Sequence, residues 1–202
     1  MENFHLRPKI LVPDTNILVD NLGDIQHLAE SGDFSVRVPT TVLVELEGLS
    51  KESGRSSPEL RENSRAAVSW LRDKPTNTKC VTTKGSLLNN FSLGTEEDCS
   101  DGQVLSLCIP GFNILDSIQK NDDRILQCCL SLNTSPEASV VEGIKTIPRD
   151  SVLITDDRSV LAIGIIILRV SQFRNLRLKA HTADCAVISI KEFMTWIKTV
   201  KP

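Results

Sequence analysis

Acidic side chains follow apolar segments at widely separated points of this 202-residue chain. Asp14 follows the strand-like stretch 9–13, and Asp157 closes a second one that starts at residue 151. Asp122 opens a segment with helical periodicity. In open α/β sheets, ligands bind in the crevice outside the carboxyl ends of the strands. Three acids that reach one such edge predict a site for a hard divalent cation.

The chemistry of phosphodiester hydrolysis explains why several carboxylates would converge. Mg²⁺ and Mn²⁺ prefer carboxylate oxygens and water as ligands. Two such ions about 4 Å apart activate water and stabilise the leaving oxygen. Without cations the carboxylates would repel each other, and some would have to be protonated. Convergence of the acids therefore predicts that any activity depends on metal.

Each acid also has a purely structural interpretation. Asp14 can cap the helix that follows it, and Thr15 and Asn16 are orienting or capping groups. Acids in a first helical turn complement the helix dipole, which accounts for Asp122 and Asp123 without any function. Of these two, Asp122 is expected to face the interior, and Asp123 is expected to point toward solvent. One cap suffices, however, so three capping residues in a row favour a functional role for Asp14.

Two further positions are ambiguous. Alternation along a strand places Thr155 and Asp157 on one side and Asp156 on the other. Glu45 lies at the edge of the apolar stripe of a helix that begins at Thr40. A solvated glutamate is the commoner situation there, so periodicity alone does not make Glu45 functional.

Strands and helices alternate along the chain, which predicts one domain, 1–202, with a mainly parallel sheet covered by helices on both faces. Residues 1–8 are expected to be a linker or tail, and 133–150 a polar loop. The expected strands are 9–13, 34–39, 79–83, 151–157 and 185–188, and the expected helices are 18–29, 40–49, 59–73, 121–130, 174–180 and 191–200.

Composition narrows the function classes. The net charge is −3, which weakens a nucleic-acid interpretation without excluding it, because bound cations would reverse the local sign. Aromatic residues make up 4% of the chain, so base stacking is not expected to dominate RNA binding. The six cysteines lack paired short spacing and the three histidines are scattered, which argues against zinc and for reduced thiols.

Several common motifs are missing from the sequence. There is no phosphate-binding G-x-x-x-x-G-K-[ST], no dinucleotide-binding G-x-G-x-x-G and no serine-hydrolase G-x-S-x-G. The segment 1–7 has no apolar core of a signal peptide, and the longest apolar run, 160–168, is too short to cross a bilayer. A cytoplasmic location, with the nucleus as a second compartment, is expected.

Taken together, the acidic motifs resemble those of the PIN-domain nucleases, particularly the PIN domains of nonsense-mediated mRNA decay. Each motif alone is weak, but the combination extends from Leu11 to Trp196. The resemblance implies a three-layer α/β sandwich with a central twisted sheet. The residues that carry it are Val12-Pro13-Asp14-Thr15-Asn16, Val44-Glu45-Leu46, Asn121-Asp122-Asp123 with Ile125-Leu126 and Cys128-Cys129-Leu130, and Leu153-x-Thr155-Asp156-Asp157-Arg158.

What the resemblance implies is metal-dependent endonucleolytic cleavage of single-stranded RNA. Asp14, Asp122 and Asp157 match the family's catalytic, metal-binding aspartates, and Glu45 matches a further acid. The implied partners are mRNA and, through regions outside this chain, mRNA decay factors. The implied cofactor is Mn²⁺ or Mg²⁺. Neither a membrane nor a small-molecule cofactor is expected. The candidate substrate-binding residues are Asn16, Thr155, Arg158, Arg177 and Lys179, and a solvated basic helix is an equal explanation for the last two.

Other interpretations stay open. A catalytically inactive PIN-like module could act as a protein-binding scaffold in a decay complex, and a phosphatase could use Asp14 as its nucleophile. Two apolar stretches, 104–117 and 159–173, interrupt the family pattern. They are either insertions or translated intron sequence, and sequencing of the transcript distinguishes the two.

Overall fold

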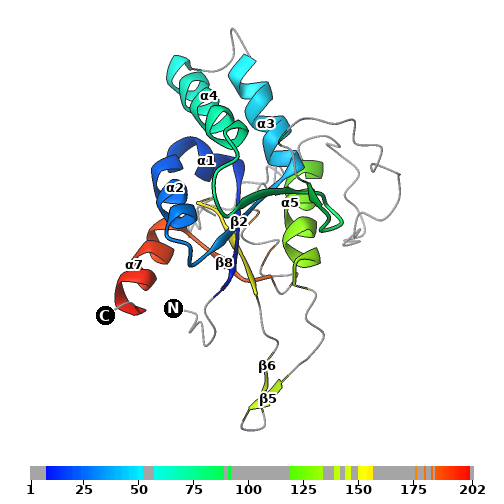
Figure 1. Ribbon diagram of the computed structural model, residues 1–202. Helices are drawn as coiled ribbons and strands as arrows, with labels where there is room; N and C mark the ends of the chain where they lie inside the picture. The colour runs from blue at the N-terminus through cyan, green and yellow to red at the C-terminus, as the bar shows by residue number, and fades with distance from the viewer. Residues whose placement is uncertain are drawn as a thin grey trace, which may run out of the picture.

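The structure is a computed structural model that describes residues 8–51, 57–88, 91, 119–133, 139–141, 144–146, 150–156, 176, 180, 183 and 185–200. In these segments strands and helices alternate along the chain, and the first strand lies in the middle of a sheet (Figure 1). Asp157, Arg158, Arg177 and Lys179 lie outside the described residues, as do the stretches 104–117 and 159–173.

A six-stranded sheet with the order β4-β3-β2-β1-β7-β8 forms the centre of the fold. All neighbouring strands in it are parallel except β3 and β4, which are antiparallel. This confirms the expected mainly parallel sheet. The strands are β1 (Ile10–Pro13), β2 (Ser35–Pro39), β3 (Thr78–Val81), β4 (Leu87–Leu88), β7 (Ser151–Ile154) and β8 (Val187–Ile188).

Helices cover the sheet on both sides, which gives the three-layer α/β arrangement. In Figure 1, α2 and α7 lie to the left of the strands and α5 lies to the right, while α3 and α4 pack against each other at the top. The helices are α1 (Thr15–Asp20), α2 (Leu22–Glu30), α3 (Thr40–Lys51), α4 (Pro58–Arg72), α5 (Gln119–Ser131) and α7 (Ile190–Val200).

The register of β1 and β7 brings two distant segments together at the carboxyl edge of the sheet. Pro13 is paired with Ile154, and the Asp14 N–H donates to the Ile154 carbonyl over 3.0 Å. Asp14 and Thr155 are therefore neighbours, although they are 141 positions apart in sequence. The start of α3 reaches the same edge, because Thr40 follows β2 directly.

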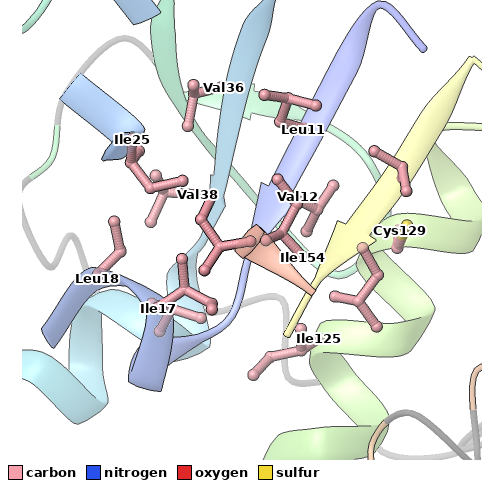
Figure 2. Close-up of a cluster of buried hydrophobic side chains, with 14 of the residues drawn as sticks. Leu11, Val12, Ile17, Leu18, Ile25, Val36, Val38, Ile125, Cys129 and Ile154 are labelled. Atoms are coloured by element: carbon pink, nitrogen blue, oxygen red, sulfur yellow. The ribbon is translucent and has the colours of Figure 1, made fainter. Parts of the chain in front are cut away.

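Aliphatic side chains fill the space between sheet and helices, as the low aromatic content requires. Figure 2 shows Ile125 and Cys129 of α5 beside Ile154 of β7, with Ile17 of α1 nearer to β2. All four are at most 1% exposed. Burial of such side chains removes apolar surface from water and is the main force that fixes α5, and with it Asp122, against the sheet.

A small aromatic cluster anchors α7. Phe193 is fully buried, meets Phe34 edge-on at 5.4 Å between ring centroids, and stacks on Trp196 at 5.6 Å. Edge-on and offset-stacked rings are the favoured arrangements of aromatic pairs. The closing helix is thereby attached to the sheet beside β2.

Two expectations about secondary structure were wrong. The segment expected as one helix over 18–29 is two helices, α1 and α2, which meet at Asn21. The segment 133–150, expected as a loop, contains an antiparallel hairpin of β5 (Ser139–Val141) and β6 (Ile144–Thr146). The short antiparallel strand β4 was not expected either.

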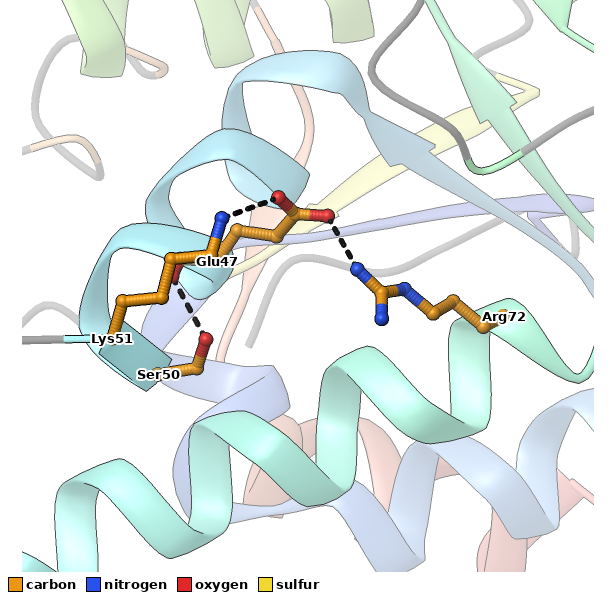
Figure 3. Close-up of polar contacts among 4 residues, drawn as sticks. All are labelled: Glu47, Ser50, Lys51 and Arg72. Atoms are coloured by element: carbon orange, nitrogen blue, oxygen red, sulfur yellow. Dashed lines mark hydrogen bonds and ion pairs between the residues drawn. The ribbon is translucent and has the colours of Figure 1, made fainter.

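Glu47 connects the two helices at the top of the molecule. This side chain is buried at the inner face of α3, and its carboxylate pairs with Arg72 of α4 at 3.1 Å and with Lys51 at 3.4 Å (Figure 3). The Arg65 Nε donates to the Ser50 carbonyl at 3.2 Å and adds a second link between α3 and α4. These contacts fix the orientation of the helix that carries Glu45.

Glu47→Ala is expected to lower the free energy of unfolding by about 1 kcal/mol, because the two cationic partners are largely exposed and solvent screens the pairs. Chemical denaturation measures the change. Glu62→Ala, at an exposed position of α4, is the control and is expected to change stability by less than about 0.5 kcal/mol. Equal effects of the two substitutions would contradict a role for Glu47 in joining the helices.

The four described cysteines, Cys80, Cys128, Cys129 and Cys185, are free and buried. Burial raises the pKa of Cys128 to about 12, and the neighbouring Cys80 adds to this effect, so the group is a thiol at neutral pH. Among the described helices none is long and apolar enough to span a membrane.

Candidate active site

Asp14 lies at the end of β1 and is almost completely enclosed, with 6% of its surface exposed. One carboxylate oxygen accepts from the Thr15 N–H at 2.6 Å and caps α1. The other accepts from the Thr155 hydroxyl at 3.1 Å. The capping interpretation is therefore correct, but it uses only one of the two oxygens. The bond from Thr155 ties Asp14 to the end of β7 as well.

Glu45 belongs to the same edge. Its two carboxylate oxygens accept hydrogen bonds from the Thr15 hydroxyl and from the Asn121 side-chain amide, the latter at 2.6 Å. Glu45 is thus not simply a solvated residue on the side of α3. Thr15 contacts both acids, through its N–H to Asp14 and through its hydroxyl to Glu45. Asn16, the residue after it, is exposed.

Asp122 completes the described acidic group. It stands in the first turn of α5, directly after Asn121, and its charge raises the pKa of Asp14, as does the charge of Glu45. Asp122 and its neighbour Asp123 are both half-buried, so the expected contrast between an inward and an outward acid is weaker than the helical periodicity suggested.

The pKa of Asp14 is raised from 3.8 to about 7. Desolvation by burial is the largest cause, and the negative charges of Asp122 and Glu45 raise the value further. The hydrogen bonds from Thr15 and Thr155 act in the opposite direction and do not compensate. The site therefore disfavours the ionised form of Asp14 unless positive charge is brought to it.

Thr155 and Asp156, the two residues after β7, make contacts in different directions. Thr155 is fully buried and faces Asp14, whereas the Asp156 carboxylate accepts from the Ile190 N–H at 3.3 Å, at the start of α7. Asp156 is therefore directed away from Asp14, as strand alternation predicts. The same alternation assigns Asp157 to the side of Thr155, but this residue lies outside the described part of the chain.

The donor set fits a hard divalent cation in its chemistry. A buried carboxylate with a raised pKa and two nearby acids offers oxygen ligands and an excess of negative charge, which is what Mg²⁺ and Mn²⁺ require. Within the segments described, no three His, Cys, Asp or Glu side chains already stand at the spacing of a metal site. Asp157, the fourth expected acid, is not among those segments.

Asn121 was recognised from the sequence only as part of the motif Asn121-Asp122-Asp123 and was not assigned to the site. Its amide provides the bond between α5 and Glu45. A signal did exist: an amide is one of the few neutral side chains that can donate to a carboxylate, and asparagine is a poor residue for a helix interior. Its presence one position before a candidate ligand could have been taken as functional.

Fold and site together define a mainly parallel α/β domain with a carboxylate cluster at the carboxyl edge of its sheet. The family model described as PIN domain matches residues 11–191. The chain therefore belongs to the PIN-domain family, a family that includes nucleases, and the resemblance of the motifs and the expected fold class are confirmed.

Two individual relatives are similar to parts of the chain. The telomerase-binding protein EST1A of Danio rerio is 28% identical over 209 residues, which cover 96% of this chain and 12% of the relative. The chain thus corresponds to about one eighth of that protein's length. Among solved structures, the PIN domain of human SMG5 is 32% identical over 35% of this chain and 60% of its own, with a TM-score of 0.28.

Proposed function

We propose that this protein is a metal-dependent endoribonuclease that cleaves single-stranded RNA. The observation that carries the proposal is the enclosed Asp14 carboxylate, which has a pKa raised to about 7 and lies next to the acids Glu45 and Asp122 at the carboxyl edge of the sheet. Burying a carboxylate among other carboxylates costs stability, so a cation that neutralises them accounts for the arrangement. The membership in a family that includes nucleases supports the same conclusion.

The residues divide into ligands and groups that orient them. Asp14, Asp122 and Asp157 are the proposed ligands, and Glu45 is a further ligand or a group that orients water. When bound, Mn²⁺ or Mg²⁺ supplies positive charge that polarises the phosphodiester and makes water more acidic. Thr155 is fully buried with its hydroxyl on Asp14, so we assign it to holding that ligand rather than to contacting RNA.

The RNA-binding part of the proposal rests on other residues. Asn16 is exposed next to the site, and Arg158, Arg177 and Lys179 are the basic candidates for phosphate contacts. The substrate would be mRNA undergoing nonsense-mediated decay in the cytoplasm or nucleus. Decay factors would bind through regions outside this chain, which corresponds to a small part of its Danio rerio relative.

A second candidate function is a catalytically silent PIN module that serves as a scaffold for protein partners. Two observations favour it: both oxygens of Glu45 already have side-chain donors, and the described acids do not stand at metal-site spacing. On this alternative the acids would be structural, with Asp14 capping α1 and Glu45 joining α1, α3 and α5.

Incubation of the protein with a short, internally labelled single-stranded RNA distinguishes the two functions. The endonuclease is expected to release internal fragments with Mn²⁺ and none with a chelator. A double-stranded RNA of the same sequence serves as the substrate control and is expected to be cleaved more slowly. Absence of cleavage at every Mn²⁺ and Mg²⁺ concentration, from a protein that is folded by circular dichroism, would support the scaffold instead.

A further inference from the structure

The side chain of Glu45 is fixed by two donors from different parts of the fold. The Thr15 hydroxyl reaches one carboxylate oxygen from α1, and the Asn121 amide reaches the other at 2.6 Å from α5. Glu45 itself stands on α3. Three helices far apart in sequence therefore meet at one carboxylate, at the edge where Asp14 and Asp122 also lie.

The direction of the bond from Asn121 is determined by its partner. An ionised carboxylate can only accept hydrogen bonds, so the nitrogen of the Asn121 amide must be the atom that faces Glu45. An amide donates without bringing a charge. Lysine or arginine at this position would bring a positive charge into the acidic group and compete with a cation for it.

Helix formation alone does not account for asparagine at position 121. The residue is the third of α5, inside its first turn, and no helix cap is formed by its side chain among the described hydrogen bonds. Asparagine is also less favourable in a helix than alanine or glutamine. The bond to Glu45 and the position directly before Asp122 give a reason for its presence there.

We propose that Asn121 is a positioning residue of the candidate active site, whose side-chain amide, together with the Thr15 hydroxyl, holds the Glu45 carboxylate in the orientation that RNA cleavage requires. This inference rests on the proposed function. Asn121 acts through Glu45 and does not itself contact RNA or metal. Its replacement should therefore change the rate of cleavage and leave binding of the RNA unaffected.

A double-mutant cycle with Asn121→Ala and Glu45→Ala tests the inference. Asn121→Ala is expected to lower kcat about 10- to 100-fold, the usual effect of removing a group that orients a metal or catalytic ligand, with KM for a short single-stranded RNA unchanged. In the Glu45→Ala background the same substitution is expected to change kcat by less than about twofold, because its partner is already absent. Asn63→Ala, at a half-buried helical position of α4, is the matched control and should leave kcat unchanged.

A second readout does not depend on cleavage. Free Mn²⁺ is measured by electron paramagnetic resonance in solutions of the RNA-free variants, and thermal unfolding confirms that each is folded. If Glu45 is a ligand, Asn121→Ala weakens Mn²⁺ binding as well as lowering kcat. Unchanged kcat and unchanged Mn²⁺ affinity in Asn121→Ala would overturn the inference, and so would an equal loss with and without Glu45.

The same measurements separate this inference from the proposed function. A wild-type chain that binds Mn²⁺ without cleaving RNA defeats the endonuclease proposal, and the role of Asn121 is then decided by the Mn²⁺ affinities of the four variants in the cycle. A wild-type chain that neither binds Mn²⁺ nor cleaves RNA overturns both.

Discussion

Asp14→Asn is expected to lower kcat for RNA cleavage about 10²- to 10⁴-fold while the protein stays folded. Asparagine keeps the shape of the side chain: its Oδ1 can accept from the Thr15 N–H, and its Nδ2 can donate to the Thr155 hydroxyl oxygen, but the substitution removes a negative charge from the cation site. A bound metal ion contributes several kcal/mol to the stabilisation of charge in the transition state, and each 1.36 kcal/mol corresponds to a factor of ten in rate.

Single-turnover cleavage of a labelled single-stranded RNA, at saturating Mn²⁺, measures this effect. Asp20→Asn is the matched control, because Asp20 is exposed at the end of the same helix and is not directed into the site by any described hydrogen bond. Full activity in Asp14→Asn would exclude Asp14 as a catalytic ligand and leave its capping of α1 as the only role.

The second large effect concerns the stability of the metal-free protein. The pKa of Asp14 in the folded state, about 7, lies above the ordinary value of 3.8, so between these values the folded protein binds more protons than the unfolded one. Stability is therefore lost as the pH rises from about 4 to about 7, and it stays lower above that range. The shift of the Asp14 pKa from 3.8 to about 7 corresponds to a loss of roughly 4 kcal/mol in the free energy of unfolding.

Asp14→Asn removes this loss. The variant should match the wild type near pH 3, where both side chains are neutral, and exceed it by up to roughly 4 kcal/mol near pH 8. Denaturant unfolding in the presence of a chelator, at a series of pH values, measures the difference. Addition of Mn²⁺ at high pH should stabilise the wild type and have little effect on the variant. Parallel stability curves for the two proteins would contradict the raised pKa of Asp14.

Much of the site could be predicted from the sequence because it depends on local rules. Strand alternation separates Thr155 from Asp156 correctly, since successive side chains of a strand point to opposite faces. The parallel sheet explains why Asp14 and Thr155 meet, because carboxyl ends of parallel strands share an edge. The position of Asp122 could be predicted because the apolar spacing of α5 indicates where this helix begins, and Asp122 lies in its first turn.

Features that depend on exact side-chain geometry could not be predicted. The position of Glu45 at the edge of the apolar stripe of α3 is compatible with exposure to solvent. Only the packing of α3 against α5 shows that the Asn121 side chain contacts Glu45. The break between α1 and α2 was missed because the apolar spacing continues through Asn21. The sequence contains a signal for the hairpin of β5 and β6, namely a glycine between two short β-branched segments. The polar residues around these segments nevertheless favoured the prediction of a loop.

The central claim is that acids distant in sequence form one cation site at the carboxyl edge of the sheet. Anomalous diffraction from crystals soaked in Mn²⁺ tests it most directly, because it locates the ion without reference to activity. The predicted result is a Mn²⁺ peak in contact with carboxylate oxygens of Asp14 and Asp122. Peaks elsewhere on the surface only, in crystals where the site is open to solvent, would contradict the claim.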